Sequence, residues 1–151
     1  MNEGAASEAR ETLAAPTAES GRRADQLMDV LENFLAAACQ ADERLARRLC
    51  VADTVWTTYL TDADQAFTIY LDRFPIEFRR DEDPSAEVKV YSSVADNIDA
   101  WTGRNFLGLA IANGTVTYEG PVRKVLRVVP MFRPLGRHGD FRTLVQRSSA
   151  S

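Results

Sequence analysis

Apolar residues near the start of the chain follow the spacing of an α-helix. They recur three and four positions apart at Leu27, Val30, Leu31, Phe34, Leu35 and Ala38. Acidic residues occupy the opposite face at Asp25, Asp29 and Glu32. The pattern predicts a long amphipathic helix that begins near Ala24 and continues to Leu49, with a break near residues 40–42.

The spacing then changes to the alternation of apolar and polar residues that is typical of β-strands. Phe67, Ile69 and Leu71, for example, alternate with polar or amphipathic neighbours. The same alternation predicts strands at residues 54–61, 66–73, 76–79 and 87–90, separated by charged turns. Because each strand has one apolar and one polar face, we expect an antiparallel meander with one side exposed to water.

Three further changes of spacing follow between residues 93 and 132. Ser93 is a suitable N-cap for a short helix over residues 94–101 that places Trp101 on its apolar side. Helical spacing resumes at Phe106, Leu107, Ala110 and Ile111. Asn113-Gly114 marks a turn, and the alternation of Val116 and Tyr118 with polar residues predicts a fifth strand.

A final helix is predicted to start after Gly120-Pro121, because proline is compatible with the first turn of a helix. Its apolar stripe consists of Val122, Val125, Leu126 and Val129, and Pro130 ends it. Arg123, Lys124 and Arg127 then face away from the stripe. We interpret the stretch from residue 103 to 132 as one wall of an apolar cavity that offers almost no reactive groups.

The order of these elements predicts an α+β fold with helices gathered on one face of a sheet. Residues 1–22 contain one leucine and no aromatic residue, so we expect them to be disordered. The expected domain covers residues 23–133, and residues 134–151 form a flexible basic tail.

Composition limits the classes of function. With two cysteines, Cys39 and Cys50, and a single histidine, His138, the sequence argues against a Cys/His zinc site. No apolar run approaches the eighteen or so residues of a membrane span, and the acidic start does not read as a secretory signal, so we expect a cytoplasmic protein. Residues 121–151 carry 7 basic groups and one acid, whereas residues 1–120 carry 11 basic and 21 acidic groups. This asymmetry fits either a solvated tail or contact with an anionic surface.

Several local sequences resemble the sterol carrier protein 2 family of lipid-binding domains. The resemblance runs from about Val55 to Phe132, with the amphipathic helix before it in the expected place. Its motifs are a pair of strands at 56–60 and 67–71, the strand Ala86–Tyr91 after a charged turn, the helix end Trp101-Thr-Gly-Arg104, and Asn113–Gly120 before the last helix. Arg73-Phe74-Pro75 departs from the glycine-containing hairpin turn of many members.

The resemblance implies a five-stranded, mainly antiparallel sheet covered by helices, with an apolar tunnel that holds a sterol, fatty acid, acyl-CoA or phospholipid. It implies no catalytic residue and no cofactor. Apolar residues that otherwise fill a closed core then become candidates to line the cavity: Phe34, Phe67, Ile69, Trp101, Phe106, Ile111, Leu126, Val129, Met131 and Phe132. The basic residues Arg123, Lys124, Arg127 and Arg133 are candidates to face an anionic membrane.

Two other classes of function remain open at this stage. A small cone-shaped isomerase or cyclase needs a buried acid or base, for which Asp72 and Asp96 are the candidates, although both fall on polar faces. An interaction or dimerisation module would instead pack the apolar face near Met131 and Phe132 against a partner. Asp62-Ala-Asp64 and Asp81-Glu-Asp83 are interpreted as solvated turns, and nucleic acid is not an expected partner.

Overall fold

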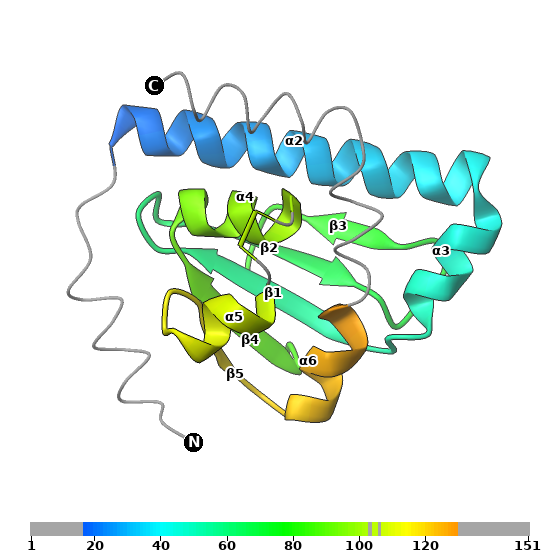
Figure 1. Ribbon diagram of the computed structural model, residues 1–151. Coiled ribbons are helices and arrows are strands. Elements are labelled where there is room, and N and C mark those ends of the chain that lie inside the picture. Colours follow the sequence, from blue (N-terminus) through cyan, green and yellow to red (C-terminus); the bar gives the residue numbers. More distant parts are fainter. Residues whose placement is uncertain (1–16, 103, 106, 130–151) are drawn as a thin grey trace.

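The structure is a computed structural model that describes residues 17–102, 104–105 and 107–129. Its longest element is helix α2, Ala18–Ala41, which spans the top of the view in Figure 1. Thr17 and Ser20 form a capping box at its start, because each side chain accepts a hydrogen bond from the backbone N–H of the other residue at 3.0 Å. Ser20 also donates to the carbonyl of Asp62 at 2.7 Å. The expectation of disorder is therefore wrong for residues 18–22, and residues 1–16 lie outside the described part.

The break predicted near residues 40–42 is confirmed. Asp42 separates α2 from helix α3, Glu43–Cys50, and its carboxylate accepts a hydrogen bond from the backbone N–H of Leu45 at 3.0 Å. An aspartate at this position satisfies one of the free N–H groups of the new helix. The chain therefore changes direction here and turns toward the first strand (Figure 1).

The sheet has five strands in the spatial order β3-β2-β1-β4-β5. Their bounds are Val55–Leu60 for β1, Gln65–Tyr70 for β2, Glu77–Arg79 for β3, Val88–Ser92 for β4 and Thr117–Glu119 for β5. Three of the pairings are antiparallel, and β1 pairs with β4 in parallel. The expected meander is therefore wrong after β3, because β4 lies on the far side of β1.

The segment between β3 and β4 makes this crossover on the outer face of the sheet, away from the helices. Thr57 and Thr68 are register partners on that face, and both meet the crossover: Thr68 donates to the carbonyl of Asp81 at 2.8 Å, and the N–H of Asp83 donates to Thr57 at 3.3 Å. Both threonines are buried. The alternation in the sequence indicates the two faces of each strand, but it does not indicate which strands are neighbours.

The remaining helices are α4, Val94–Thr102, α5, Leu107–Ala112, and α6, Val122–Val128. The predicted cap at Ser93 is confirmed, since its hydroxyl accepts a hydrogen bond from the N–H of Asp96 at 3.0 Å. Figure 1 shows α4, α5 and α6 in front of the strands, on the same side of the sheet. The chain is thus an α+β domain whose mixed, mostly antiparallel sheet has its helices on one face, as predicted.

Candidate functional site

The sheet presents one largely apolar surface to the helices. Register partners point to the same side of a sheet, so Trp56 shares this side with Ile69 on β2 and Val88 on β4. The same registers add further residues to this surface: Thr58, Leu60, Phe67, Phe78, Val90, Ser92 and Tyr118. We call these residues the helix-facing surface.

Helices α2, α4, α5 and α6 cover the helix-facing surface with apolar side chains. These side chains and the strand residues form a single buried cluster, to which the helices contribute Leu27, Leu31, Phe34, Leu35, Ile98, Trp101, Leu107, Ala110, Val125 and Val128. The helix and sheet layers therefore meet along one apolar zone, which we call the interlayer. A ligand held between them would contact hydrocarbon on both sides.

The structure brings several of the predicted lining residues together in the interlayer. Phe34, Phe67, Ile69 and Trp101 are all buried in the one cluster. Phe67 also stacks on Phe78, with ring centroids 5.5 Å apart. Both a packed core and a cavity wall would bury these residues in one cluster. Their burial does not distinguish the two, and the apolar tunnel itself stays a prediction.

The other predicted lining residues are partly buried, exposed or outside the described part of the chain. Ile111 and Val129 are partly buried and pack against the edge of the cluster. Phe106, Met131 and Phe132 lie outside the described residues, as does the basic residue Arg133. Leu126 is 63% exposed, so its assignment to the interior is wrong.

Helix α6 has a different buried face from the one predicted. Lys124, Val125 and Val128 point inward, whereas Val122 is 58% exposed and Leu126 faces water. The sequence contains two overlapping apolar stripes. The buried one includes a lysine, so the hydrophobic pattern alone favours the wrong stripe. The predicted orientation of Lys124 is therefore wrong, while Arg123 and Arg127 are exposed as expected.

Lys124 can be buried because polar groups that precede two strands pair with its ammonium group. Its Nζ donates to the backbone carbonyl of Asp53 and lies 3.4 Å from Oε2 of Glu87 and 3.8 Å from Oδ2 of Asp53. Asp53 precedes β1, and Glu87 precedes β4. The lysine therefore fastens α6 to the end of the sheet where the parallel pair begins.

Neutral polar side chains form a second group inside the interlayer, which we call the interior polar cluster. It consists of Trp56, Thr58, Ser92, Asn97 and Trp101. The indole N–H of Trp56 donates to Thr58 at 3.0 Å, that of Trp101 donates to Oδ1 of Asn97 at 2.8 Å, and Nδ2 of Asn97 donates to Ser92 at 3.0 Å. The hydrophobic pattern of the sequence does not indicate this cluster, although an asparagine one turn before a tryptophan is a recognisable helical pair.

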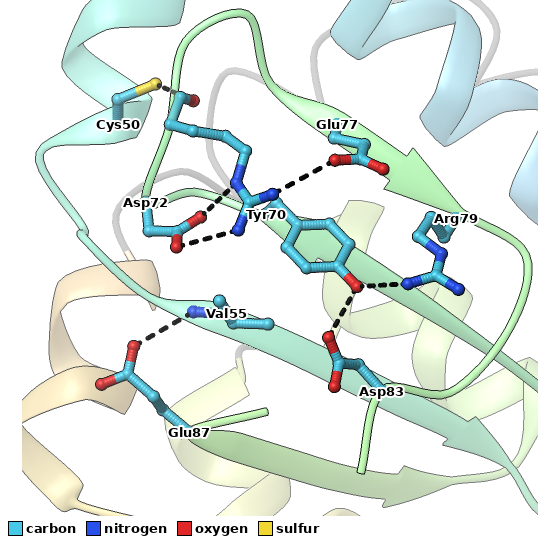
Figure 2. A network of polar contacts seen from close by, with 9 residues as sticks. Cys50, Val55, Tyr70, Asp72, Glu77, Arg79, Asp83 and Glu87 are labelled. Carbon is cyan, nitrogen blue, oxygen red and sulfur yellow. Dashed lines mark hydrogen bonds and ion pairs between the residues drawn. The ribbon is translucent and has the colours of Figure 1, made fainter. Parts of the chain in front are cut away.

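The outer face of the sheet carries a charged network of another kind (Figure 2). The hydroxyl of Tyr70 donates to Asp83 at 2.7 Å and accepts a hydrogen bond from Arg79 at 2.9 Å. The Arg73 guanidinium lies 4.4 Å from the centroid of the Tyr70 ring. Hydrogen bonds from Ser85 and Tyr70 lower the pKa of Asp83 to about 2. The turn at 81–83, interpreted as solvated, is therefore tied to the sheet.

The described residues also border an open groove of about 320 Å³ beside the first half of α2. Its lining is largely polar and comprises Asp25, Met28, Asp64, Gln65, Ala66, Arg80 and Asp81. Arg80 forms ion pairs with Asp29 and Glu32 at 2.5 and 2.9 Å. The polar lining gives this groove little in common with the predicted apolar cavity.

The two acids considered for catalysis lie at the surface or in a cap. Asp72 is exposed and receives two hydrogen bonds from Arg73, which lower the pKa of its carboxyl group. Asp96 accepts a hydrogen bond from Ser93 at 2.9 Å within the cap of α4.

His138 lies outside the described residues. Among those described, no cluster of three His, Cys, Asp or Glu side chains could hold a metal ion, and no helix has the length and apolarity of a membrane span.

Comparison with solved structures places this geometry among known folds. No protein-family model and no curated protein sequence matches the chain. The structure is similar to sterol carrier protein 2 from Yarrowia lipolytica, with a TM-score of 0.60 and 14% identity over 74% of this chain and 91% of that one. It is also similar to sterol carrier protein domain 2 of Helicoverpa armigera, with a TM-score of 0.61 and 14% identity over 83% of this chain and 97% of that one.

A third similar structure is a ubiquinone synthesis protein, UbiJ-SCP2, with a TM-score of 0.57 and 13% identity over 75% of this chain and 93% of that one. The chain therefore has the fold of sterol carrier protein 2 domains, and it spans nearly the whole of each. At these identities the likeness concerns the fold.

Proposed function

We propose that this protein binds a lipid in the interlayer and acts as a carrier rather than an enzyme. The observation that carries the proposal is the match of a complete domain to sterol carrier protein 2 folds, over 97% of the Helicoverpa armigera domain. The apolar zone between sheet and helices supports it, because hydrocarbon would meet apolar side chains on both sides. The proposed ligand classes are a sterol, fatty acid, acyl-CoA or phospholipid.

Burial of a lipid chain supplies enough free energy for such a function. A chain of about sixteen carbons gains on the order of 12 kcal/mol at about 0.8 kcal/mol per methylene group. Lost translational freedom and the ordering of the chain offset several kcal/mol of this gain. The remainder corresponds to dissociation constants around the micromolar range, which suits a carrier that must also release its ligand.

The proposal is tested by titration with cis-parinaric acid, a fluorescent fatty acid, followed by displacement with unlabelled lipids. We expect saturable binding of one molecule per chain. Ala110 is fully buried on α5, so the substitution Ala110→Leu should occupy ligand space and weaken binding about tenfold without lowering the melting temperature. The control is Leu126→Ala, which lies at the surface and should bind normally. If Ala110→Leu instead destabilises the protein and binding is absent, the interior is a closed core.

We propose that α6 is the part of the carrier that approaches membranes. Its outward face combines the exposed apolar residues Val122 and Leu126 with Arg123 and Arg127. Cationic groups attract an anionic surface, and apolar neighbours can enter its outer layer. Lys124, which the sequence assigned to this face, is excluded from it by its burial.

The alternative of an interaction module keeps one observation in its favour. Leu109 on α5 is 61% exposed, in addition to the two apolar residues of α6. A second copy of the chain could cover them and form a dimer around a closed core. Light scattering distinguishes the two functions, because a stable dimer without saturable lipid binding supports the module and contradicts the carrier.

A further inference from the structure

The interior polar cluster is unusual because it places hydroxyl and amide groups where the proposed function needs hydrocarbon. Thr58 is 1% exposed, Ser92 3% and Asn97 5%. Burying polar groups costs free energy unless they are hydrogen-bonded, so each such group calls for an explanation. Apolar residues of similar size would fill the same space at a lower cost.

The hydrogen bonds of this cluster leave donors unused. A serine or threonine hydroxyl can donate one proton as well as accept. Thr58 accepts from Trp56, and Ser92 accepts from Asn97, but within the described part of the chain neither hydroxyl proton has an acceptor. Asn97 likewise has a second amide proton without a described acceptor. The cluster therefore offers hydrogen-bond donors to a group that carries an acceptor.

The unused donors converge on one region of the interlayer. Thr58 pairs in register with Val90, and Ser92 lies two residues further along the same strand, so both hydroxyls are on the helix-facing surface of neighbouring strands. Strand spacing and rise place their Cα atoms about 8 Å apart. Asn97 on α4 closes the region from the helix side through its bond to Ser92. One oxygen atom between the strands could accept from both hydroxyls.

The charge of the surroundings restricts what this oxygen can belong to. Lys124 is the one charged side chain that is buried among the described residues, and it pairs with Asp53 and Glu87 before the starts of β1 and β4. Ser92 is at the opposite end of β4. A carboxylate or phosphate beside Ser92 would be a buried charge without a cation, which is strongly unfavourable.

We propose that Thr58, Ser92 and Asn97 recognise a neutral acceptor oxygen of the bound lipid, as in an ester, ketone or alcohol. The inference rests on the proposed lipid-binding function and adds a ligand preference to it. Hydrocarbon burial supplies the affinity, and the polar groups select among lipids of similar length. Anionic lipids, cis-parinaric acid among them, then bind only with the charged group outside the interlayer and are poor ligands when that group must enter it.

The test compares methyl dodecanoate, dodecan-1-ol, dodecanoate and dodecane as displacers of cis-parinaric acid. The readout is the ratio of the affinity for methyl dodecanoate to that for dodecane, because a general change in folding or cavity size moves both affinities together. In Thr58→Val and in Ser92→Ala we expect this ratio to fall about fivefold, the usual worth of one hydrogen bond. Thr58→Ser, which keeps the hydroxyl, should retain the ratio of the original protein.

Thr57→Val is the matched control, because it makes the same change one residue away on the outer face of β1. It should leave the ratio unchanged even if it lowers stability. An unchanged ratio in Thr58→Val and Ser92→Ala, or a preference for dodecanoate over methyl dodecanoate, would overturn this inference while the carrier function stands. If none of the displacers and no parinaric acid binds, the carrier function fails and this inference fails with it.

Discussion

Gly120 connects the last strand to α6 at a point where two backbones come very close. Its φ angle is +127°, and a Cβ atom at this position would lie 2.3 Å from the carbonyl oxygen of Glu87. Both the backbone conformation and the available space therefore require glycine. Glu87 also pairs with Lys124, so this contact helps to position α6 against β4.

We expect Gly120→Ala to lower the free energy of unfolding by about 3 kcal/mol, because strain and steric overlap add. Gly114→Ala is the matched control: its φ is +84°, but nothing lies within 4 Å of the added Cβ. This control should cost only about 1 kcal/mol. Urea denaturation of the two variants measures the difference, and equal losses would show that the approach of Glu87 to Gly120 is not restrictive.

Asp83 links stability to pH through the crossover on the outer face. Its pKa is lowered from 3.8 to about 2 in the folded chain by the hydrogen bonds from Ser85 and Tyr70. A lowered pKa stabilises the fold above the unfolded value near 4, and this contribution is lost as the pH falls from about 4 toward 2. Stability measured by urea denaturation should therefore decline less steeply over this range in Asp83→Asn. Parallel declines in the two proteins would contradict the role of this carboxylate.

At the scale of elements, α6 shows why the sequence pattern alone was insufficient. Its valines and leucine allow two stripes, one through residues 122, 126 and 129 and another through 125 and 128. The buried stripe is decided by Lys124, whose partners Asp53 and Glu87 are distant in the sequence. The same limit applies to β4, whose parallel partner is set by the crossover rather than by its own alternation.

The outward face of α6 yields a prediction about lipid transfer. Arg123→Glu combined with Arg127→Glu should slow transfer from protein to anionic vesicles several-fold, because each cation near such a surface is worth about 1 kcal/mol. Lipid affinity in solution should stay the same, since both side chains are exposed. Transfer of a fluorescent lipid to vesicles with and without phosphatidylserine measures this. Equal transfer rates for both proteins and both kinds of vesicle would show that α6 does not make the membrane contact.

At the scale of the whole molecule, the class of fold and the order of its elements could be predicted from hydrophobic spacing. The break at Asp42, the cap at Ser93 and the strand faces around Phe67 and Ile69 depend on residues close in sequence, and each was found. The start of α2 was missed although its capping box, Thr17 and Ser20, is local in sequence; the bond from Ser20 to Asp62 adds a contact across the fold that the sequence does not indicate. The interior polar cluster was missed for a different reason: its hydrogen bonds span only two to five residues, but strand pairing alone places Thr58 on the strand next to Ser92.

The central claim is that a lipid occupies the space between the sheet and helices α2, α4, α5 and α6. Native mass spectrometry of the intact chain, purified without detergent, tests it most directly, with organic extraction to identify what is released. The account predicts a species heavier than the bare chain by the mass of one lipid, and loss of that species in Ala110→Leu. A single species at the mass of the bare chain, unchanged after incubation with lipid vesicles, would contradict it.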